Sequence, residues 1–164
     1  MQQSESMPRL RIRLATVGDA DVVAELLFAF NTEFETPTPS ADEFAPRLRD
    51  MIASEAAFVV LAEVDHIGVG FALVTTRSTP YGDGPLAQLE ELYVRSDLRG
   101  QGIGSQVMTL LVEEVRRRDG IEIHINVDEI DHDTRRFYEQ HGFTNIQPGE
   151  EFAMLCYLRE LPSA

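Results

Sequence analysis

The sequence predicts a single mixed α/β domain over residues 9–164, preceded by a flexible tail at 1–8. Three observations lead to this fold class. A chain of 164 residues is long enough to build one substantial core. Segments with the period of strands and of helices follow one another in the order β-α-α-β-β-β-α-β-α-β-β. A glycine-rich turn at 99–104 joins a strand to a helix, as in several nucleotide-binding folds.

The first half of the chain predicts a strand, two helices and a hairpin. Charged and apolar residues alternate at 9–14, which is the period of a half-buried strand. Pro37 and Pro39 interrupt the helical pattern, and Asp65-His66 forms a short turn between two apolar runs. The predicted elements are a strand at 9–14, a helix that follows 16–19 and runs through Phe30, a loop at 31–40, a helix at 40–53, and strands at 57–63 and 67–76.

The second half predicts four strands and two helices. Apolar residues fall on one face of the segment 102–118, and isoleucines alternate with polar residues at 121–128. A helix that begins at Asp131 is stopped by His141-Gly142. The predicted elements are a loop at 78–85, a strand at 86–94, a helix at 102–118, a strand at 121–128, a helix at 131–140, and strands at 143–146 and 152–158.

The charge and composition limit the classes of partner. With a formal net charge of −14, the chain is repelled by nucleic-acid phosphates and anionic lipids, so neither partner is expected, whereas cationic amines are favoured. All 14 basic residues are arginines, which excludes a Schiff-base lysine and a phosphate-loop lysine. The histidines show no metal-ligand spacing, so no metal is expected. The polar N-terminus, the lack of a long apolar run and the single cysteine predict a cytoplasmic protein.

The turn Arg99-Gly100-Gln101-Gly102-Ile103-Gly104 is the first candidate site. Its glycines remove side chains where a helix begins, so that unpaired backbone N–H groups can approach an anion. The third glycine comes one position too early for a dinucleotide-binding fold, and a P-loop would need a lysine. Taken alone, the turn is equally compatible with a phosphate site and with a strand-to-helix turn that binds nothing.

Two motifs resemble the GNAT superfamily of N-acetyltransferases. Arg99, Gly102 and Gly104 match its Gln/Arg-x-x-Gly-x-Gly/Ala signature, after a stretch, 89–94, that looks like the family's fourth strand. Asp131-x-x-Thr134-x-x-Phe137-Tyr138, followed by Gly142-Phe143, looks like its second signature, Asn-x-x-Ala-x-x-Phe-Tyr. Asp and Thr replace the usual Asn and Ala there, which puts only side-chain contacts with the cofactor in doubt.

This resemblance covers nearly the whole chain, although the segment 15–55 carries none of the signature. It implies a GNAT-like α/β fold: a central mixed six- to seven-stranded sheet flanked by about four helices, with splayed fourth and fifth strands. It also implies transfer of an acetyl group from acetyl-coenzyme A (acetyl-CoA) to a primary amine by direct attack. Family members are often dimers, so a homodimer is an expectation of the same resemblance.

The resemblance also implies which residues form the site. Backbone groups of the fourth strand would pair with the pantetheine arm, the glycine-rich turn would hold the pyrophosphate, and the later helix would complete the site. Tyr138 takes the family's general-acid position, from which it would protonate the leaving thiolate. The cofactor-binding residues expected in this way are Leu92, Tyr93, Val94, Arg99, Gly100, Gln101, Gly102, Ile103, Gly104, Ser105, Asp131 and Phe137.

The general base is sought among two adjacent glutamates, Glu90 and Glu91. Neighbouring residues of a strand face opposite ways unless a bulge intervenes, so one of the two should point into the site. Glu90 ranks first because it matches a position where related sequences often carry a carboxylate. Glu91 alone is interpreted as a solvated or ion-paired carboxylate.

The acceptor is less well defined by the sequence. The segment 30–37 combines aromatic residues with two carboxylates, which would suit a cationic amine. The interpretation we favour is that Phe30 and Phe34 pack inward as helix residues four apart. A small cationic amine is the expected acceptor, and a protein lysine or N-terminal amine is an alternative. A non-catalytic module that senses acetyl-CoA is the alternative from another class.

Overall fold

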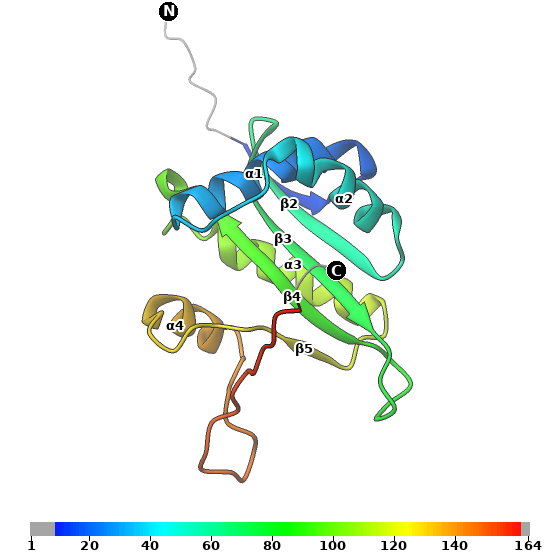
Figure 1. Ribbon diagram of the computed structural model, residues 1–164, viewed down its shortest axis with the longest axis vertical. Helices are drawn as coiled ribbons and strands as arrows, with labels where there is room; N and C mark the ends of the chain where they lie inside the picture. Colours follow the sequence, from blue (N-terminus) through cyan, green and yellow to red (C-terminus); the bar gives the residue numbers. More distant parts are fainter. Residues whose placement is uncertain (1–8, 162–164) are drawn as a thin grey trace, which may run out of the picture. The chain divides into compact units, whose positions relative to one another are not determined.

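The computed structural model describes residues 9–161, so the tail predicted at 1–8 lies outside the described residues (Figure 1). The chain divides into two compact units, Met1–Ile125 and Asn126–Ala164. The first unit holds a sheet covered by helices, and the second holds helix α4 (His132–Gln140).

The sheet of the first unit has five strands in the order β1-β2-β3-β4-β5. Neighbouring strands are antiparallel, except that β4 and β5 are parallel, so the sheet is mixed as predicted. The β2–β3 hairpin is confirmed: Val64 pairs with Ile67, and Asp65 and His66 both have positive φ, as a two-residue hairpin turn requires. The strands are β1 (Leu10–Leu14), β2 (Ala57–Val64), β3 (Ile67–Arg77), β4 (Leu86–Val94) and β5 (Glu122–His124).

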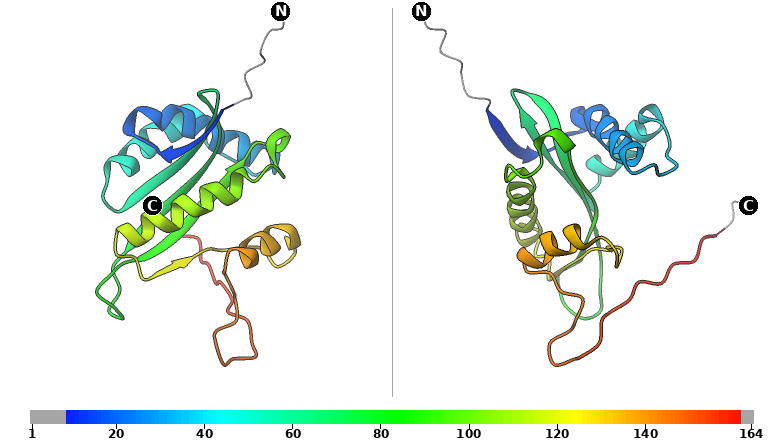
Figure 2. Two further views of the ribbon diagram at one scale, coloured as in Figure 1. Left: turned by 180° about the vertical axis from the view of Figure 1, so that it is seen from behind. Right: turned by 90° about the vertical axis from the view of Figure 1, so that its left-hand side faces the viewer.

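Helices cover both faces of this sheet (Figure 2). Helices α1 (Ala20–Glu33) and α2 (Ala41–Ala53) lie on one face, where their apolar side chains pack on Phe71, Leu73 and Tyr93. Helix α3 (Ile103–Arg117) lies on the other face and buries one stripe of apolar residues. Because helices cover both faces of the sheet, β2 and the middle of β3 are buried. Their sequences are accordingly nearly continuous apolar runs.

Side-chain caps mark the starts of α2 and α4. Ser40 and Glu43 form a capping box, in which the Ser40 hydroxyl accepts from the Glu43 N–H and the Glu43 carboxylate accepts from the Ser40 N–H. In the second unit, the Asp131 carboxylate accepts from the Thr134 N–H at 3.2 Å and caps α4. Helix α4 ends at Gln140, and Gly142 shortly after it has a φ of 87°. This agrees with the prediction that His141-Gly142 ends the helix.

Three predicted strands are corrected. The strand at 121–128 is reduced to the three residues of β5, and the strands at 143–146 and 152–158 are wrong. Within the second unit the only pairing found between these last two segments is a single bridge, Ile146 to Ala153. Apolar sequence favours burial but does not supply a hydrogen-bonded neighbour, and Tyr157 remains 88% exposed. The sheet therefore has five strands rather than six or seven.

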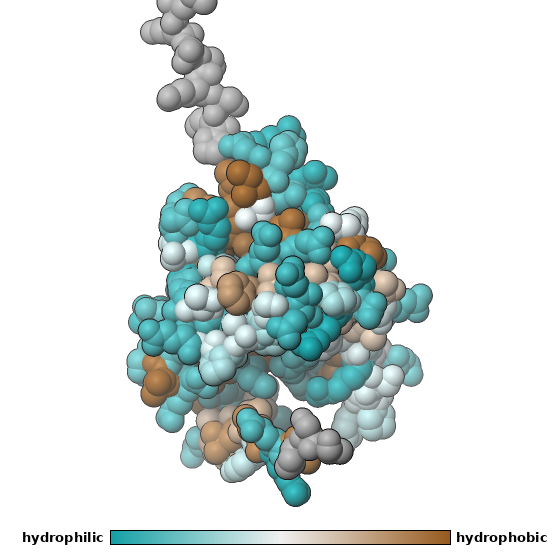
Figure 3. Space-filling model, turned by 45° about the horizontal axis from the view of Figure 1, so that its top comes forward, coloured by the Kyte–Doolittle hydropathy of each residue, from teal (hydrophilic) through white to brown (hydrophobic). Residues whose placement is uncertain are grey.

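None of the helices within 9–161 combines the length and the apolar character needed to cross a membrane. The face seen in Figure 3 is largely hydrophilic, with apolar side chains in separate patches. Such a surface agrees with the formal net charge of −14.

Candidate active site

A β-bulge in β4 brings Glu90 and Glu91 to the same face of the sheet. Leu73 of β3 pairs with Glu91, but the next residue, Val74, pairs with Leu89, so Glu90 is the extra residue. The Glu90 carboxylate accepts a hydrogen bond from the Thr75 hydroxyl. Thr75 and Leu73 are two residues apart in β3 and share a face, so both glutamates lie on the face that α1 and α2 cover. The sequence allowed for a bulge between the two glutamates, and the structure contains one.

The two carboxylates have different surroundings. Glu90 is exposed, whereas Glu91 is half-buried. Burial, together with the charge of Glu90, raises the pKa of the Glu91 carboxyl group. A carboxylate with a raised pKa is a stronger base, so the geometry favours Glu91 over Glu90 as the base, contrary to the order expected from the sequence.

The edge of β4 next to β5 is open beyond its first residues. The parallel pairing with β5 involves Leu86, Ala87 and Gln88, while the pairing with β3 continues along β4 to Val94. The stretch from Leu89 to Val94 therefore has strand pairing on one side only among the described residues of the first unit. This agrees with the expected separation of the fourth and fifth strands, and it leaves backbone groups available to an extended ligand.

The glycine-rich turn has the backbone that its sequence predicts. Gly100 and Gly102 adopt φ values of 75° and 80°, a region that favours glycine. Gly102 precedes α3, whose first N–H groups have no partner within the helix. A Cβ atom built on either glycine would meet no atom within 4 Å. The space over the turn is therefore open, and the unpaired N–H groups could hold an anion.

Arg99, at the start of this turn, is held by residues of β4 and α1. Its Nε donates to the carbonyl oxygen of Val94 at 2.8 Å. Its two terminal nitrogens donate to the two carboxylate oxygens of Glu33, at 2.6 and 2.9 Å. The Tyr93 hydroxyl donates to the same carboxylate at 3.1 Å. Arg99, which was expected to bind a phosphate, is thus paired with the Glu33 carboxylate. The Val94 carbonyl, which was expected to be available to pantetheine, already accepts a hydrogen bond from Arg99.

Aromatic rings surround this ion pair. The Arg99 guanidinium lies 6.0 Å from the centre of the Phe34 ring and 5.6 Å from that of Tyr93. Phe30 stacks on Tyr93 and meets Phe34 edge to face, at centroid distances of 5.2 and 5.3 Å. The predicted contact between Phe30 and Phe34 is present, but the prediction that both pack inward is wrong for Phe34, which follows the last residue of α1 and is 57% exposed.

The remaining predicted residues belong to the second unit. Tyr138 is buried and contacts Phe137 and Phe143, with ring centroids 5.3 and 5.5 Å away. Phe137 also lies against the His141 ring, and Asp131 acts as the cap of α4. These contacts explain why the second motif needs its aromatic residues: they form the core of α4 and the turn after it.

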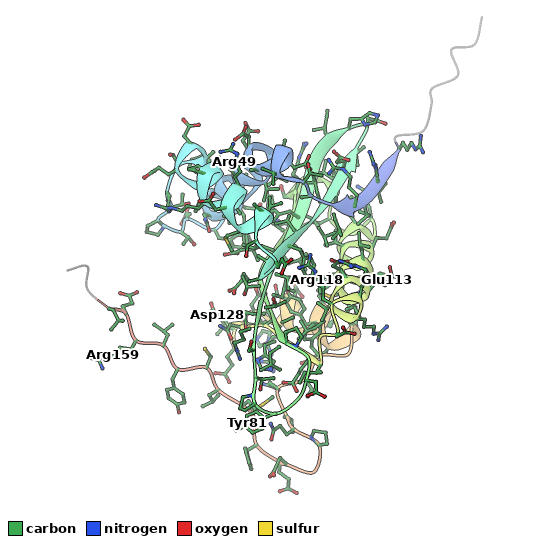
Figure 4. The ribbon with its side chains drawn as sticks, turned by 90° about the vertical axis from the view of Figure 1, so that its right-hand side faces the viewer. Arg49, Tyr81, Glu113, Arg118, Asp128 and Arg159 are labelled. Atoms are coloured by element: carbon green, nitrogen blue, oxygen red, sulfur yellow. The ribbon has the colours of Figure 1, made fainter. Side chains whose placement is uncertain are left out.

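Other surface features do not join this site. Tyr81, which Figure 4 labels, lies in the loop between β3 and β4. It is 92% exposed. A hollow of about 520 Å³ beside α1 is lined by Tyr93, Arg95 and Asp97 among others, but neither the glycine-rich turn nor the glutamates contribute to it.

Sequence reasoning missed the role of Glu33. The residue lies in the aromatic and acidic segment 30–37, but its partner Arg99 is 66 positions away. Only the spacing of Phe30, Glu33 and Phe34 on one side of a helix could have drawn attention to it.

Comparisons with known proteins now identify the family. Residues 22–143 match the family model of the GNAT acetyltransferases. The chain belongs to the GNAT family. It is accordingly an N-acetyltransferase, and the expected GNAT-like fold class is confirmed.

Three relatives illustrate the range of similarity. The crystal structure of a protein assigned as an acetyltransferase, from Arthrobacter sp. FB24, is 43% identical, with a TM-score of 0.85 over 98% of this chain and 99% of that one. Glucosamine 6-phosphate N-acetyltransferase 1 of Oryza sativa subsp. japonica is 27% identical over 146 residues, which are 85% of this chain and 87% of the relative. An aminoglycoside N-acetyltransferase in complex with CoA shares the fold at 16% identity, with a TM-score of 0.77 over 96% of this chain and 99% of the other.

Proposed function

We propose that this GNAT protein transfers the acetyl group of acetyl-CoA to a small cationic primary amine. The observation that carries the proposal is the bulge at Glu90. It gathers two carboxylates on one face of β4, a strand whose second edge has no strand partner from Leu89 to Val94 among the described residues of the first unit. The glycine-rich turn follows this strand after the short 3-10 helix Ser96–Leu98. A base, a strand edge and an anion site thus follow one another within Glu90–Ser105.

The described residues fit the cofactor. The open space over Gly100 and Gly102 and the free N–H groups at the start of α3 suit a diphosphate, to which Arg99, Gln101, Ile103, Gly104 and Ser105 would contribute. The bond from the Arg95 N–H to the Val69 carbonyl sets the alternation of the ladder, in which the backbone groups of Tyr93 face β3 and those of Leu92 and Val94 face the open edge. Leu92 and the N–H of Val94 therefore suit the amides of pantetheine, while Tyr93 lies between them. Asp131 and Phe137 complete the proposed set on the basis of the second motif.

The chemistry requires two proton movements. When bound, acetyl-CoA supplies an activated thioester. The amine nitrogen forms a bond to the acetyl carbon, the carbon–sulfur bond breaks, and the thiol leaves. Glu91, whose pKa is raised by burial, would accept the proton that the ammonium must lose, with Glu90 beside it to hold the positive charge. Tyr138 would donate its phenolic proton to the leaving sulfur.

The nature of the acceptor follows from the charge. A chain with net charge −14 attracts cations, and Glu33, Glu90 and Glu91 add carboxylates near β4. This favours an amine of positive overall charge, such as a polyamine or an aminoglycoside, over a phosphorylated amino sugar. Two relatives support a small acceptor by name, one for an aminoglycoside and one for a phosphorylated amino sugar.

A thiol-release assay tests the proposal. The protein would be incubated with acetyl-CoA and a panel of aminoglycosides, polyamines, glucosamine 6-phosphate, and peptides with free lysines or N-termini. We expect release with a cationic small amine and a large loss of rate in Tyr138→Phe. Release with peptides alone would favour a protein acetyltransferase. Tight binding of acetyl-CoA with no release from any amine would favour a sensor and contradict the proposal.

A further inference from the structure

We propose that the Glu33 carboxylate is an exchangeable partner of Arg99, which the diphosphate of the cofactor displaces from the guanidinium. This inference rests on the proposed function, because it needs CoA to bind at the glycine-rich turn. It adds to that function a residue of α1 that neither family signature contains, and it couples the cofactor side of the protein to α1.

The Arg99 guanidinium has contacts beyond its ion pair with Glu33. An arginine has five N–H donors, and Arg99 uses one on the Val94 carbonyl and two on Glu33. The bond from Nε to Val94 and the rings of Phe34 and Tyr93 fix the guanidinium without the help of Glu33. The terminal nitrogens can therefore change partner while the side chain stays beside the turn.

The two groups that compete for Arg99 differ in charge. The Arg99 and Glu33 side chains are 41% and 28% exposed, so their ion pair is in contact with solvent and is weak. A diphosphate carries more than one negative charge, and arginine binds phosphate in the same two-pronged geometry as carboxylate. A diphosphate that also binds the N–H groups of α3 should therefore replace the single carboxylate.

Glu33 occupies an unfavourable position for a carboxylate. It is the last residue of α1, where the helix dipole disfavours a negative charge. Its carboxylate is stabilised there by Arg99 and by the Tyr93 hydroxyl, and these contacts lower the pKa of Glu33. Once released from Arg99, the carboxylate and the carbonyl end of α1 form a negative group beside Phe30 and Phe34. Such a group suits an ammonium ion with an apolar body.

Calorimetry with CoA tests the exchange through a double-mutant cycle. In Glu33→Gln the ion pair with Arg99 is absent before CoA binds, so the cofactor does not have to break it. CoA should therefore bind about two- to fivefold more tightly, which is the range expected from the energy of an exposed ion pair. In the Arg99→Gln background the same change should have no effect, since there is no cation to release. Glu25→Gln removes an exposed carboxylate from the same helix and should leave CoA affinity unchanged.

Acetyl-pantetheine, which lacks the diphosphate, is the matched control ligand. Its affinity should be the same for the wild type, Glu33→Gln and Arg99→Gln. Thermal unfolding of each variant shows that the comparison is made on folded protein.

The other outcomes overturn the inference in distinct ways. Weaker or unchanged CoA binding in Glu33→Gln means that Glu33 supports Arg99 or does not act on it. Tighter binding that persists without Arg99 means simple repulsion between Glu33 and the ligand. Failure of the wild type to bind CoA at all would contradict the proposed function itself, which separates the two claims.

Discussion

The glycine-rich turn allows a sharp test, because the structure separates backbone strain from loss of an anion site. Gly102 has a φ of 80° and open space where a Cβ would lie, so a side chain there is strained but does not clash. Any L-residue at this φ should cost about 1 kcal/mol of stability. Gly102→Ala should therefore lower the free energy of unfolding by about that amount and weaken CoA binding only slightly.

Gly102→Asp adds a negative charge to the same strain. If the new carboxylate lies about 5 Å from one phosphate charge, the repulsion is about 0.8 kcal/mol in water and about 3.3 kcal/mol at an effective dielectric constant of about 20. CoA affinity should fall roughly four- to 250-fold, and further because a diphosphate carries more than one charge.

Gly149→Asp is the matched control. Gly149 also has a positive φ, 86°, and no atom within 4 Å of a built Cβ, but it lies in the second unit after α4. It should carry the same strain, visible in urea unfolding, without loss of CoA affinity in calorimetry. Equal CoA affinity in Gly102→Asp and the wild type would refute the placement of the diphosphate.

The other predictions concern the acid, the base and a buried ion network. Because burial raises the pKa of Glu91, its ionised form destabilises the fold as pH rises through that pKa. Glu91→Gln should unfold at a higher temperature than the wild type at pH 7 but not at pH 4, and acetyl transfer should fall about 10²-fold or more. Tyr138→Phe should lower kcat by about 10- to 100-fold with unchanged CoA affinity in calorimetry; an unchanged kcat would exclude it as the acid. Arg13 binds Asp19 and the buried Glu63 and lowers the pKa of both carboxyl groups. Their contribution to stability is present above the ordinary carboxyl pKa and is lost as pH falls. Arg13→Met should cost about 2–3 kcal/mol in urea unfolding at pH 7, and less at pH 3.

Elements whose residues contact near neighbours in the chain could be predicted from sequence. The strand predicted at 86–94 and the hairpin around Asp65-His66 have the expected bounds, because alternation and turn chemistry are local properties. The strand predicted at 152–158 shows the limit of this reasoning. Its apolar residues satisfy the pattern, but strand formation depends on a partner that the pattern does not contain.

For the candidate site, too, local features could be predicted from the sequence and features that depend on strand pairing could not. The positive φ of Gly100 and Gly102 could be predicted, because this backbone conformation favours glycine and a sequence motif can carry that preference. The bulge at Glu90 could not be predicted, because it depends on the register between β3 and β4. The sequence ranked Glu90 above Glu91 as the candidate base, whereas the structure favours Glu91. The burial that raises the pKa of Glu91 depends on the packing of the sheet and could not be predicted from the sequence.

The absence of lysine gives the glycine-rich turn a particular importance. If the proposed function is correct, this protein binds a polyanion although it carries a net charge of −14 and only arginine as a permanent cation. At least seven of the arginines already pair with carboxylates: Arg13, Arg49, Arg95, Arg99, Arg117, Arg118 and Arg136. The N–H groups at the start of α3 carry no competing negative charge, so they can attract a diphosphate before any ion pair is broken. Exchange at Arg99 would then follow as the second step, because the phosphate oxygens must first be close enough to compete with Glu33.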